Sequence, residues 1–304
     1  MRVALISDIH GNLPALASVL ADLSQRRVDR IIVAGDLVGH GPFPNEVVRT
    51  IRTIDPQPVV IKGNTDQRAL DLEAGRLAHH WYTARQFAAA RWTNQQLDAS
   101  SLAYLASLPD QLVSSFDDAD PIRVVHGSPR AIDDIIRLPR DDQKLIEILE
   151  EVGENVLACA HTHRPFSVRL GEKLVVNGGA LLATHNGDWR ATYATLEWRH
   201  DRWNAEHHAV PYDLERLRQA YEARGLFAAD PHFGRAVWLS IESGIDMLGP
   251  FIRHALELAH QIGYKTEETI PDHVYEEAGI SWHWSVDQVR EADKIEQSTV
   301  LSDE

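Results

Sequence analysis

Five short apolar runs in the first 165 residues each lead directly into side chains that can bind a metal ion. These side chains are, in chain order, Asp8 with His10, Asp36, Asn64, His126, and His161 with His163. The runs are rich in β-branched residues and bounded by turn residues, which is typical of buried strands. In open α/β sheets, ligands bind beyond the carboxyl ends of the strands. The pattern therefore predicts an α/β fold in which all seven side chains meet at one site.

The spacing and the chemistry of these side chains agree with a metal site. Residues i and i+2 of an extended segment point to the same side, so Asp8 can face one pocket with His10, and His161 with His163. Four imidazoles, two carboxylates and one amide oxygen, without a thiolate, suit Mn, Fe or Zn. They are too many for one tetrahedral zinc, and with one bridging carboxylate they fit two ions about 3.5–4 Å apart. Each residue alone also has an ordinary interpretation as a strand-end cap, a core histidine or a turn residue, so the prediction depends on the ordered set.

Apolar runs alternate with amphipathic stretches over about the first 200 residues, which predicts α/β layering. We expect strands at 3–6, 30–34, 59–61, 112–116, 122–125, 156–160, 167–170, 174–176, 192–197 and 203–208, and helices at 13–25, 45–54, 81–97, 100–108 and 141–152. After Pro211 the pattern predicts only helices, at 212–224, 234–243, 248–262, 273–278 and 285–296. We therefore expect a domain over residues 1–209 and a mostly helical extension over 210–304, which could cap the site or form a dimer contact. The last eight or so residues are expected to be a frayed polar tail.

Charge and composition restrict the partners and the compartment. The formal net charge of −15 argues against extended nucleic acid and against an anionic membrane surface as partners. A small anionic substrate stays compatible, because bound divalent ions reverse the local field. The single cysteine, Cys159, excludes an intrachain disulfide, and its apolar strand predicts an inert core residue. No apolar stretch approaches the roughly 18 residues of a membrane span, and the N-terminal run is too short for a signal peptide, so we expect a cytoplasmic protein.

The ordered motifs resemble those of the calcineurin-like metallophosphoesterase family. The matching blocks are Ser7-Asp8-Ile9-His10-Gly11-Asn12, Gly35-Asp36, Gly63-Asn64, Val125-His126-Gly127 and His161-Thr162-His163. The segments 35–42, 63–66 and 126–129 are similar to a small bacterial branch with Gly-Asp-Leu-Val-Gly-x-Gly-Pro, Gly-Asn-Thr-Asp and His-Gly-Ser-Pro. The resemblance covers about residues 1–200 and implies a four-layer α/β/β/α sandwich.

The resemblance also implies a metal arrangement and an activity. Asp8, His10 and His163 would bind one ion, Asn64, His126 and His161 the other, and Asp36 would bridge them. Two divalent ions (Mn, Fe or Zn, with Mn expected in vitro) would then support hydrolysis of small phosphoesters, as a phosphodiesterase or phosphatase, through a metal-bridging hydroxide. The alternatives are a non-catalytic interaction scaffold, like the retromer subunit with this fold, and a hydrolase of nucleotides or dinucleoside polyphosphates.

The chain departs from the family pattern around the substrate. Thr65 and Gly39 stand where many relatives carry the His and Asp of an acid dyad, which favours leaving groups of low pKa. His40 replaces a phosphate-contacting Arg or Tyr, and could contact phosphate, protonate the leaving group or simply pack in its loop beside Pro42. Ala160 replaces a glycine, and the usual Asn-Pro-Gly-Ser loop reads 177–180 Asn-Gly-Gly-Ala, which leaves its support of the site open.

Several further residues are candidates for substrate binding. Arg68 and Arg130 follow ligand blocks and could pair with phosphate, although exposed surface arginines are the ordinary alternative. Asn12 could contact phosphate or cap a helix, and Asn64 could contact both metal and substrate. Five histidines have no partner at metal-ligand spacing and are expected to be structural or on the surface: His185, His207, His208, His254 and His260.

Overall fold

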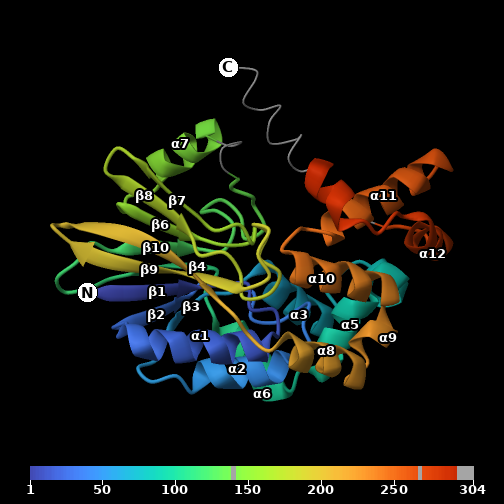
Figure 1. Ribbon diagram of the computed structural model, residues 1–304, viewed down its shortest axis with the longest axis horizontal. Coiled ribbons are helices and arrows are strands. Elements are labelled where there is room, and N and C mark those ends of the chain that lie inside the picture. Colours follow the sequence, from blue (N-terminus) through green and yellow to red (C-terminus); the bar gives the residue numbers. More distant parts are fainter. Residues whose placement is uncertain (138–141, 266–268, 293–304) are drawn as a thin grey trace.

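The computed structural model describes residues 1–137, 142–265 and 269–292, and it contains two five-stranded sheets (Figure 1). The first sheet has the order β10-β9-β1-β2-β3 and the second the order β4-β5-β6-β8-β7. The strands of the first are β1 Arg2–Ile6, β2 Arg30–Val33, β3 Val59–Val60, β9 Ala191–Arg199 and β10 Arg202–Val210. Those of the second are β4 Gln111–Ser114, β5 Ile122–Val125, β6 Val156–Cys159, β7 Phe166–Leu170 and β8 Lys173–Asn177.

Parallel pairing brings the important strand ends to one edge. In the first sheet β1 runs parallel to β2, with Val3 opposite Arg30, and β2 runs parallel to β3. In the second sheet β5, β6 and β8 are parallel, with Ile122 opposite Val156. Because the carboxyl ends of parallel strands share an edge, the residues that follow β1, β2, β3, β5 and β6 can meet.

Alternating side chains build the layers that the sequence predicts. On β1, Ala4 and Ile6 pack with the helices α1 (Leu13–Arg26) and α2 (Pro44–Arg52), whereas Val3 and Leu5 pack between the two sheets. On the outer face of the second sheet, Val125 and other apolar residues pack against α7 (Asp142–Glu151). The order helices, sheet, sheet, helix confirms the predicted α/β/β/α sandwich (Figure 1).

A group of helices connects β3 to β4. They are α3 Asn64–Glu73, α4 His80–Thr83, the 3₁₀ helix η1 Arg85–Phe87, α5 Ala88–Gln96 and α6 Ala99–Ser107. The single helix predicted over 81–97 is wrong, because Ala84 adopts an extended backbone (φ −68°, ψ 145°) between α4 and η1. The Arg91 side chain donates to the carbonyls of Trp81 (3.0 Å) and Ala84 (2.8 Å), which links both sides of the break to α5.

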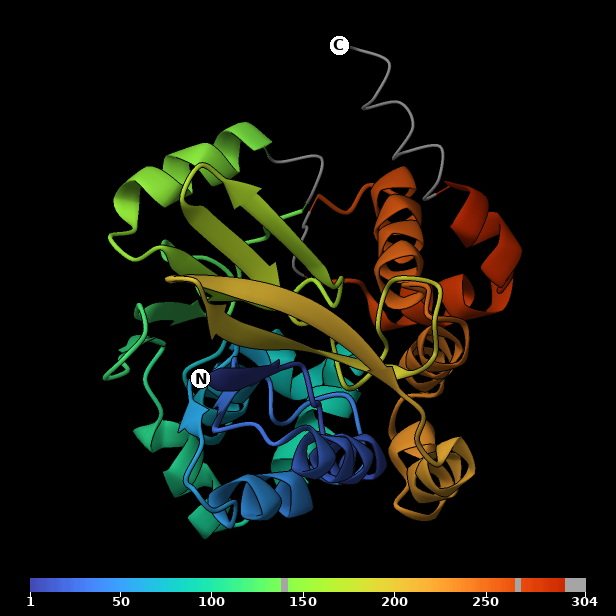
Figure 2. The same ribbon diagram turned by 60° about the vertical axis from the view of Figure 1, so that its left-hand side comes forward.

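The chain after β10 is helical, as predicted (Figure 2). Its helices are α8 Leu214–Ala223, α9 Leu226–Ala229, α10 Pro231–Ser243, α11 Leu248–Gln261 and α12 Asp272–Ser281, with residues 286–292 also helical. Leu217, Tyr221 and Trp238 join the core of the first helical layer, whereas α11 and α12 form a separate core around Phe251 and Tyr275. The end of the helix predicted at 285–296 and the predicted tail lie outside the described residues. Among the described helices, none has the length and apolarity that crossing a bilayer requires.

Candidate metal centre

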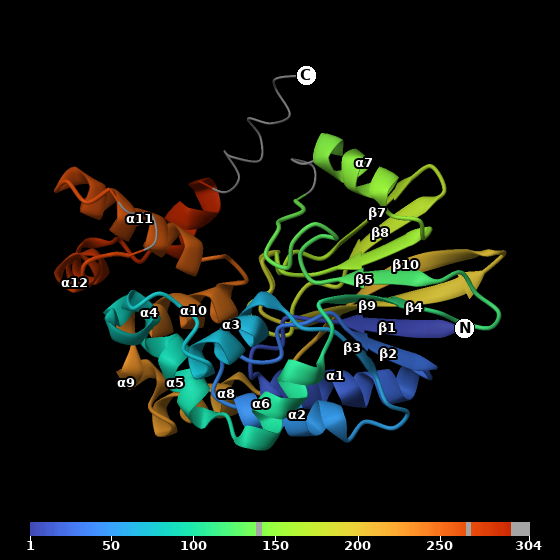
Figure 3. The ribbon, with the colours of Figure 1, turned by 180° about the vertical axis from the view of Figure 1, so that it is seen from behind.

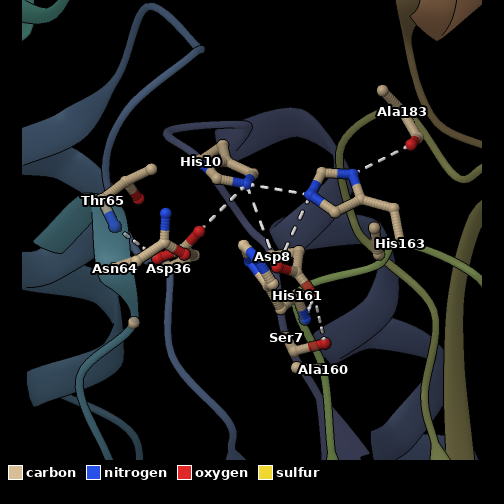
Figure 4. A network of polar contacts seen from close by, with 12 residues as sticks. Ser7, Asp8, His10, Asp36, Asn64, Thr65, Ala160, His161, His163 and Ala183 are labelled. Atoms are coloured by element: carbon tan, nitrogen blue, oxygen red, sulfur yellow. Dashed lines mark hydrogen bonds and ion pairs between the residues drawn. The ribbon is translucent and has the colours of Figure 1, made fainter. Parts of the chain in front are cut away.

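All seven predicted metal-binding side chains converge at the shared edge of the two sheets. Figure 4 labels all of them except His126. Six of them form two groups, and within each group the ligand atoms lie within 4.8 Å of one another. The first group is Asp8, His10 and His163, and the second is Asp36, His126 and His161. The amide oxygen of Asn64 completes the set, 2.9 Å from His126 Nε2. The fold therefore brings Asp8 and His163, which lie far apart in the sequence, into one group.

Asp36 lies between the two groups. Its Oδ2 is 3.5 Å from Nε2 of His10 in the first group and 3.4 Å from Nε2 of His126 in the second. Its Oδ1 accepts a hydrogen bond from the backbone N–H of Thr65 at 2.9 Å. One carboxylate oxygen is thus fixed by the backbone, and the other is left to face both groups.

Three of the imidazoles are oriented by backbone carbonyls. The Nδ1 atoms of His10, His126 and His163 lie 3.3, 2.7 and 3.0 Å from the carbonyl oxygens of Val38, Ala34 and Ala183. Because a carbonyl only accepts, each of these Nδ1 atoms carries a proton in the contact, and each Nε2 turns its lone pair inward when the ring is neutral. His10 Nε2 and His163 Nε2 then face each other at 3.1 Å without a proton to share. A cation bound by both Nε2 atoms would accept their two lone pairs.

The carboxylate of Asp8 tests whether the residues fit a metal ion. Its Oδ2 lies 2.8 Å from Ser7 Oγ and accepts from the N–H of His161 at 3.3 Å. Its Oδ1 is fully buried and has no hydrogen-bond partner within the described part of the chain, yet lies 3.5 Å from His163 Nε2. An unpaired buried carboxylate oxygen is costly, and a cation would remove that cost. Together with the mixed nitrogen and oxygen donors, this orphaned oxygen fits a divalent ion such as Mn, Fe or Zn.

The electrostatics of the site favour positive charge beside Asp36. Burial lowers the pKa of His126, but the charges of Asp36 and Asp8 together with its hydrogen bonds outweigh burial and raise this pKa to about 10. Burial would raise the pKa of Asp36, but His126 and His10 hold it well below its usual range. Burial, reinforced by the nearby His40, lowers the pKa of His10 well below its usual range. The carboxylate thus stays ionised and holds a cationic partner even without a metal ion.

Backbone strain is concentrated in the same residues. Non-glycine residues with positive φ are uncommon, and strained conformations of this kind cluster at functional sites. Here five of the seven side chains sit on such a backbone, with φ between 46° and 69°: Asp8, His10, Asp36, His161 and His163. Backbone hydrogen bonds hold two of them in place, from Asp8 N to Gly35 O (3.1 Å) and from His10 N to Asp36 O (2.9 Å).

Gly63 leaves the space that Asp36 occupies. A Cβ at this position would lie 2.0 Å from Asp36 Oδ1 and 2.3 Å from its backbone nitrogen. We therefore expect Gly63→Ala to displace Asp36 and to weaken Mn²⁺ binding by at least about tenfold, as measured by calorimetric titration. Gly153→Ala is the matched control, because nothing lies within 4 Å of its added Cβ. Equal Mn²⁺ affinities in the two variants would contradict this role of Gly63.

Asp66 supports the site although sequence reasoning assigned it no role. Its buried carboxylate accepts from the backbone N–H groups of Leu37 (3.2 Å), Val38 (3.0 Å) and Gly63 (3.0 Å). It therefore ties the loop that carries Asp36 to the start of α3, which carries Asn64. Burial and the charge of Asp36 raise its pKa to about 7, against the three donors. The sequence did contain a signal for this role. Asp66 is the third residue of α3, and an acidic side chain at that position can accept from the N–H of the N-cap residue, here Gly63.

The loop at 177–180 still supports Asp8 despite its altered sequence. The carbonyl of Gly179 lies 2.9 Å from Ser7 Oγ, which contacts Asp8 Oδ2. Asn177 donates to the carbonyl of Ala160 at 2.9 Å, just before the paired histidines. The loss of the usual proline and hydroxyl therefore leaves these contacts intact.

A cavity of about 400 Å³ opens beside the two groups. Its walls include His40, Thr65 and Arg68 from the first layer, and Val237, Asp246 and Ile252 from the helical extension. The extension therefore reaches the cleft. His185, which the sequence predicted only as a structural or surface histidine, also lines the cavity and stacks on His163 with ring centroids 5.0 Å apart. No spacing in the sequence indicated this contact.

The remaining candidates divide into two pairs. His40 and Arg68 line the cavity, and the His40 ring stacks on His10 at 4.4 Å. Burial, reinforced by His163, lowers the pKa of His40 to about 4, so its ring is uncharged at neutral pH. Asn12 is instead buried as a helix cap: Oδ1 accepts from Ala15 N, and Nδ2 donates to Leu181 O. Arg130 lies away from the cavity and pairs with Glu151 at 2.6 Å, so the structure does not bring it to the phosphate position.

Comparison with known proteins places this geometry in context. Residues 1–201 match the calcineurin-like phosphoesterase superfamily domain. A metallophosphoesterase structure from Sphaerobacter thermophilus aligns with a TM-score of 0.65 and 30% identity, over 81% of this chain and 99% of that one. An uncharacterised protein of Methanocaldococcus jannaschii is 28% identical over 235 residues, 72% of this chain and 90% of that protein. The symmetrical bis(5'-nucleosyl)-tetraphosphatase of Yersinia pestis is 37% identical over 76 residues, which span 25% of this chain and 26% of that enzyme.

Proposed function

The chain belongs to the calcineurin-like phosphoesterase superfamily, and from that premise we propose that it hydrolyses small phosphoesters with two divalent metal ions. The convergence of seven oxygen and nitrogen donors around the orphaned Asp8 Oδ1 carries this proposal. In it, Asp8, His10 and His163 hold one ion, Asn64, His126 and His161 hold the other, and Asp36 is shared. When bound, the ions would lower the pKa of a water molecule and neutralise charge on the phosphoryl oxygens.

The cavity walls suggest which phosphoesters suit the site. Arg68 offers a cation and His40 an N–H donor for phosphoryl oxygens. The Thr65 hydroxyl donates to Val38 O at 2.6 Å, so it has no proton available for a leaving group. A Cβ at Gly39 would lie 2.9 Å from His10 Nδ1, so a side-chain acid does not fit there either. We therefore propose substrates whose leaving groups depart without a proton, such as aryl esters and phosphoanhydrides.

The direct test is hydrolysis of bis(p-nitrophenyl) phosphate by the Mn-loaded protein. We expect turnover that falls about a hundredfold or more in Asn64→Ala, because this change removes one donor from the second group. Cys159→Ser should stay within about twofold, because the buried thiol, whose pKa burial raises to about 12, is far too weakly ionised to react. Equal rates in wild type and Asn64→Ala, or rapid hydrolysis of a simple alkyl monoester, would contradict the proposal.

Dinucleoside polyphosphates are a second candidate substrate class. The partial similarity to the Yersinia tetraphosphatase favours them, although it spans only a quarter of this chain. A non-catalytic scaffold is less well supported, because such a role does not require a complete set of ligand side chains. The net charge of −15 further supports small substrates over extended nucleic acid.

A further inference from the structure

A second cavity, of about 350 Å³, lies directly beside the metal cavity. It is enclosed by α3, α4, η1 and α5 on one side and by α10 and α11 on the other, which lie next to each other in Figure 3. Five residues line both cavities: His40, Thr65, Arg68, Leu248 and Ile252. The two spaces therefore adjoin each other along this shared wall.

Four aromatic rings line this second cavity, which we call the aromatic pocket: those of His40, Trp81, Phe87 and Phe233. Trp81 and Phe87 stack with ring centroids 3.8 Å apart, and Phe233 meets His40 edge-on at 5.3 Å. Small side chains, among them Ala89 and Ala90, line the rest of the cavity and leave room beside these rings. Aromatic rings attract one another in offset and edge arrangements beyond the effect of buried area. The pocket is therefore suited to a flat ring.

The hydroxyl and amide side chains that line the aromatic pocket are already engaged. Thr93 Oγ1 donates to Gly39 O at 2.5 Å, Thr65 Oγ1 donates to Val38 O, and Gln86 Oε1 accepts from Ile270 N at 2.6 Å. No carboxylate stands among its described lining residues. Recognition there would thus depend on ring stacking and burial, and not on a pattern of hydrogen bonds around the ring edge.

Arg68 stands at the junction of the two cavities. Its guanidinium lies 5.1 Å from the centre of the Trp81 ring, and within the described residues it makes no hydrogen bond or ion pair. A guanidinium that stacks on a ring and makes no hydrogen bond keeps its N–H donors available for an anion. Arg68 can therefore pair with a phosphoryl oxygen while its other face rests on the wall of the aromatic pocket.

We propose that the aromatic pocket binds a planar aromatic group of the phosphoester substrate, with Arg68 holding the phosphate at its entrance. This inference rests on the proposed function, because it places the phosphate at the metal centre. It narrows the substrates to phosphoesters that carry a flat aromatic group, either an aryl ring or a nucleobase held by its face.

Binding of phosphonates to the Mn-loaded protein tests the pocket without any chemical step. Phenylphosphonate, cyclohexylphosphonate and methylphosphonate share one charged group, and their affinities are measured by calorimetric titration. We expect phenylphosphonate to bind at least about tenfold tighter than methylphosphonate, and tighter than the non-planar cyclohexyl probe. Trp81→Ala, which removes a wall, and Ala90→Phe, which fills the space, should each bring the phenyl-to-methyl ratio close to one. In Ala90→Phe, which keeps the contact between Arg68 and Trp81, methylphosphonate affinity should stay within about threefold.

Trp198→Ala is the matched control. Trp198 is a partly exposed tryptophan on β9, and it lies beside the start of β1, whereas the metal centre follows the end of that strand. This variant should keep the wild-type ratio. If methylphosphonate binds and phenylphosphonate binds no tighter, or if cyclohexylphosphonate binds as tightly as phenylphosphonate, the aromatic pocket is overturned while the metal centre stands. If neither variant lowers the ratio, the ring binds elsewhere and the pocket is likewise overturned. Failure of the Mn-loaded protein to bind any of the three would instead reject the proposed function itself.

Discussion

Asp36→Asn should lower kcat for bis(p-nitrophenyl) phosphate by about a thousandfold or more, because it removes a negative charge that lies between the two ligand groups. The carboxylate oxygen lies 3.5 Å from His10 Nε2 and 3.4 Å from His126 Nε2, so its loss affects both groups at once. The asparagine side chain has nearly the same shape and can still accept from Thr65 N–H through its oxygen. The measurement is kcat at saturating Mn²⁺, together with the metal content of the purified variant.

Asp118→Asn makes the same change of charge on the surface and serves as the control. It should leave both kcat and metal content at wild-type values. An Asp36→Asn variant that keeps most of the wild-type rate would show that Asp36 is not shared between two ions.

Asp66→Ala should cost about 3 kcal/mol or more of unfolding free energy. The change leaves the buried N–H groups of Leu37, Val38 and Gly63 without their acceptor, and each unpaired buried donor costs about 1–3 kcal/mol. Because these donors belong to the loops that carry Asp36 and Asn64, hydrolysis should fall as well. Urea denaturation of the metal-free protein gives the stability, and kcat with Mn²⁺ gives the activity.

Asp66→Asn separates the loss of the acceptor from the loss of charge. The amide retains one oxygen for the backbone donors, so this variant should lose clearly less stability than the alanine variant. Equal destabilisation by both substitutions, or a loss below about 1 kcal/mol in Asp66→Ala, would contradict the bracing role of this carboxylate.

The layered fold and the grouping of the seven side chains could be predicted from the sequence because strand ends are local signals. Each apolar run marks a strand, and parallel strands carry their following residues to one edge. The seven donors follow five such runs, so their meeting required no knowledge of loop conformation. The structure brings six of them together in two groups and places the amide oxygen of Asn64 beside the second group.

The surroundings of the site could not be predicted in the same way, because they depend on directions that spacing does not encode. Arg68 and Arg130 both follow ligand blocks, yet only Arg68 turns into the cavity from the first turns of α3, whereas Arg130 turns to Glu151 on α7. His185 reaches His163 through a loop that shows no periodic pattern. The helical extension lines the cleft through residues such as Asp246, whose packing is set by tertiary contacts.

Local propensity also misjudged the helices beside the site. The sequence predicted one helix over 81–97, but the chain breaks at Ala84, whose carbonyl accepts a hydrogen bond from the Arg91 side chain. That break lets Trp81 stack on Phe87 in the wall of the aromatic pocket. The failure of the prediction therefore coincides with the feature that gives this cavity its aromatic surface.

Anomalous diffraction at the manganese edge, from crystals grown with Mn²⁺, tests the metal centre most directly. We expect two peaks per chain, about 3.5–4 Å apart, with Asp8, His10 and His163 at one, Asn64, His126 and His161 at the other, and Asp36 touching both. A single peak, or peaks elsewhere with Asp8, Asp36, Asn64 and His163 directed into separate places, would contradict the dinuclear centre.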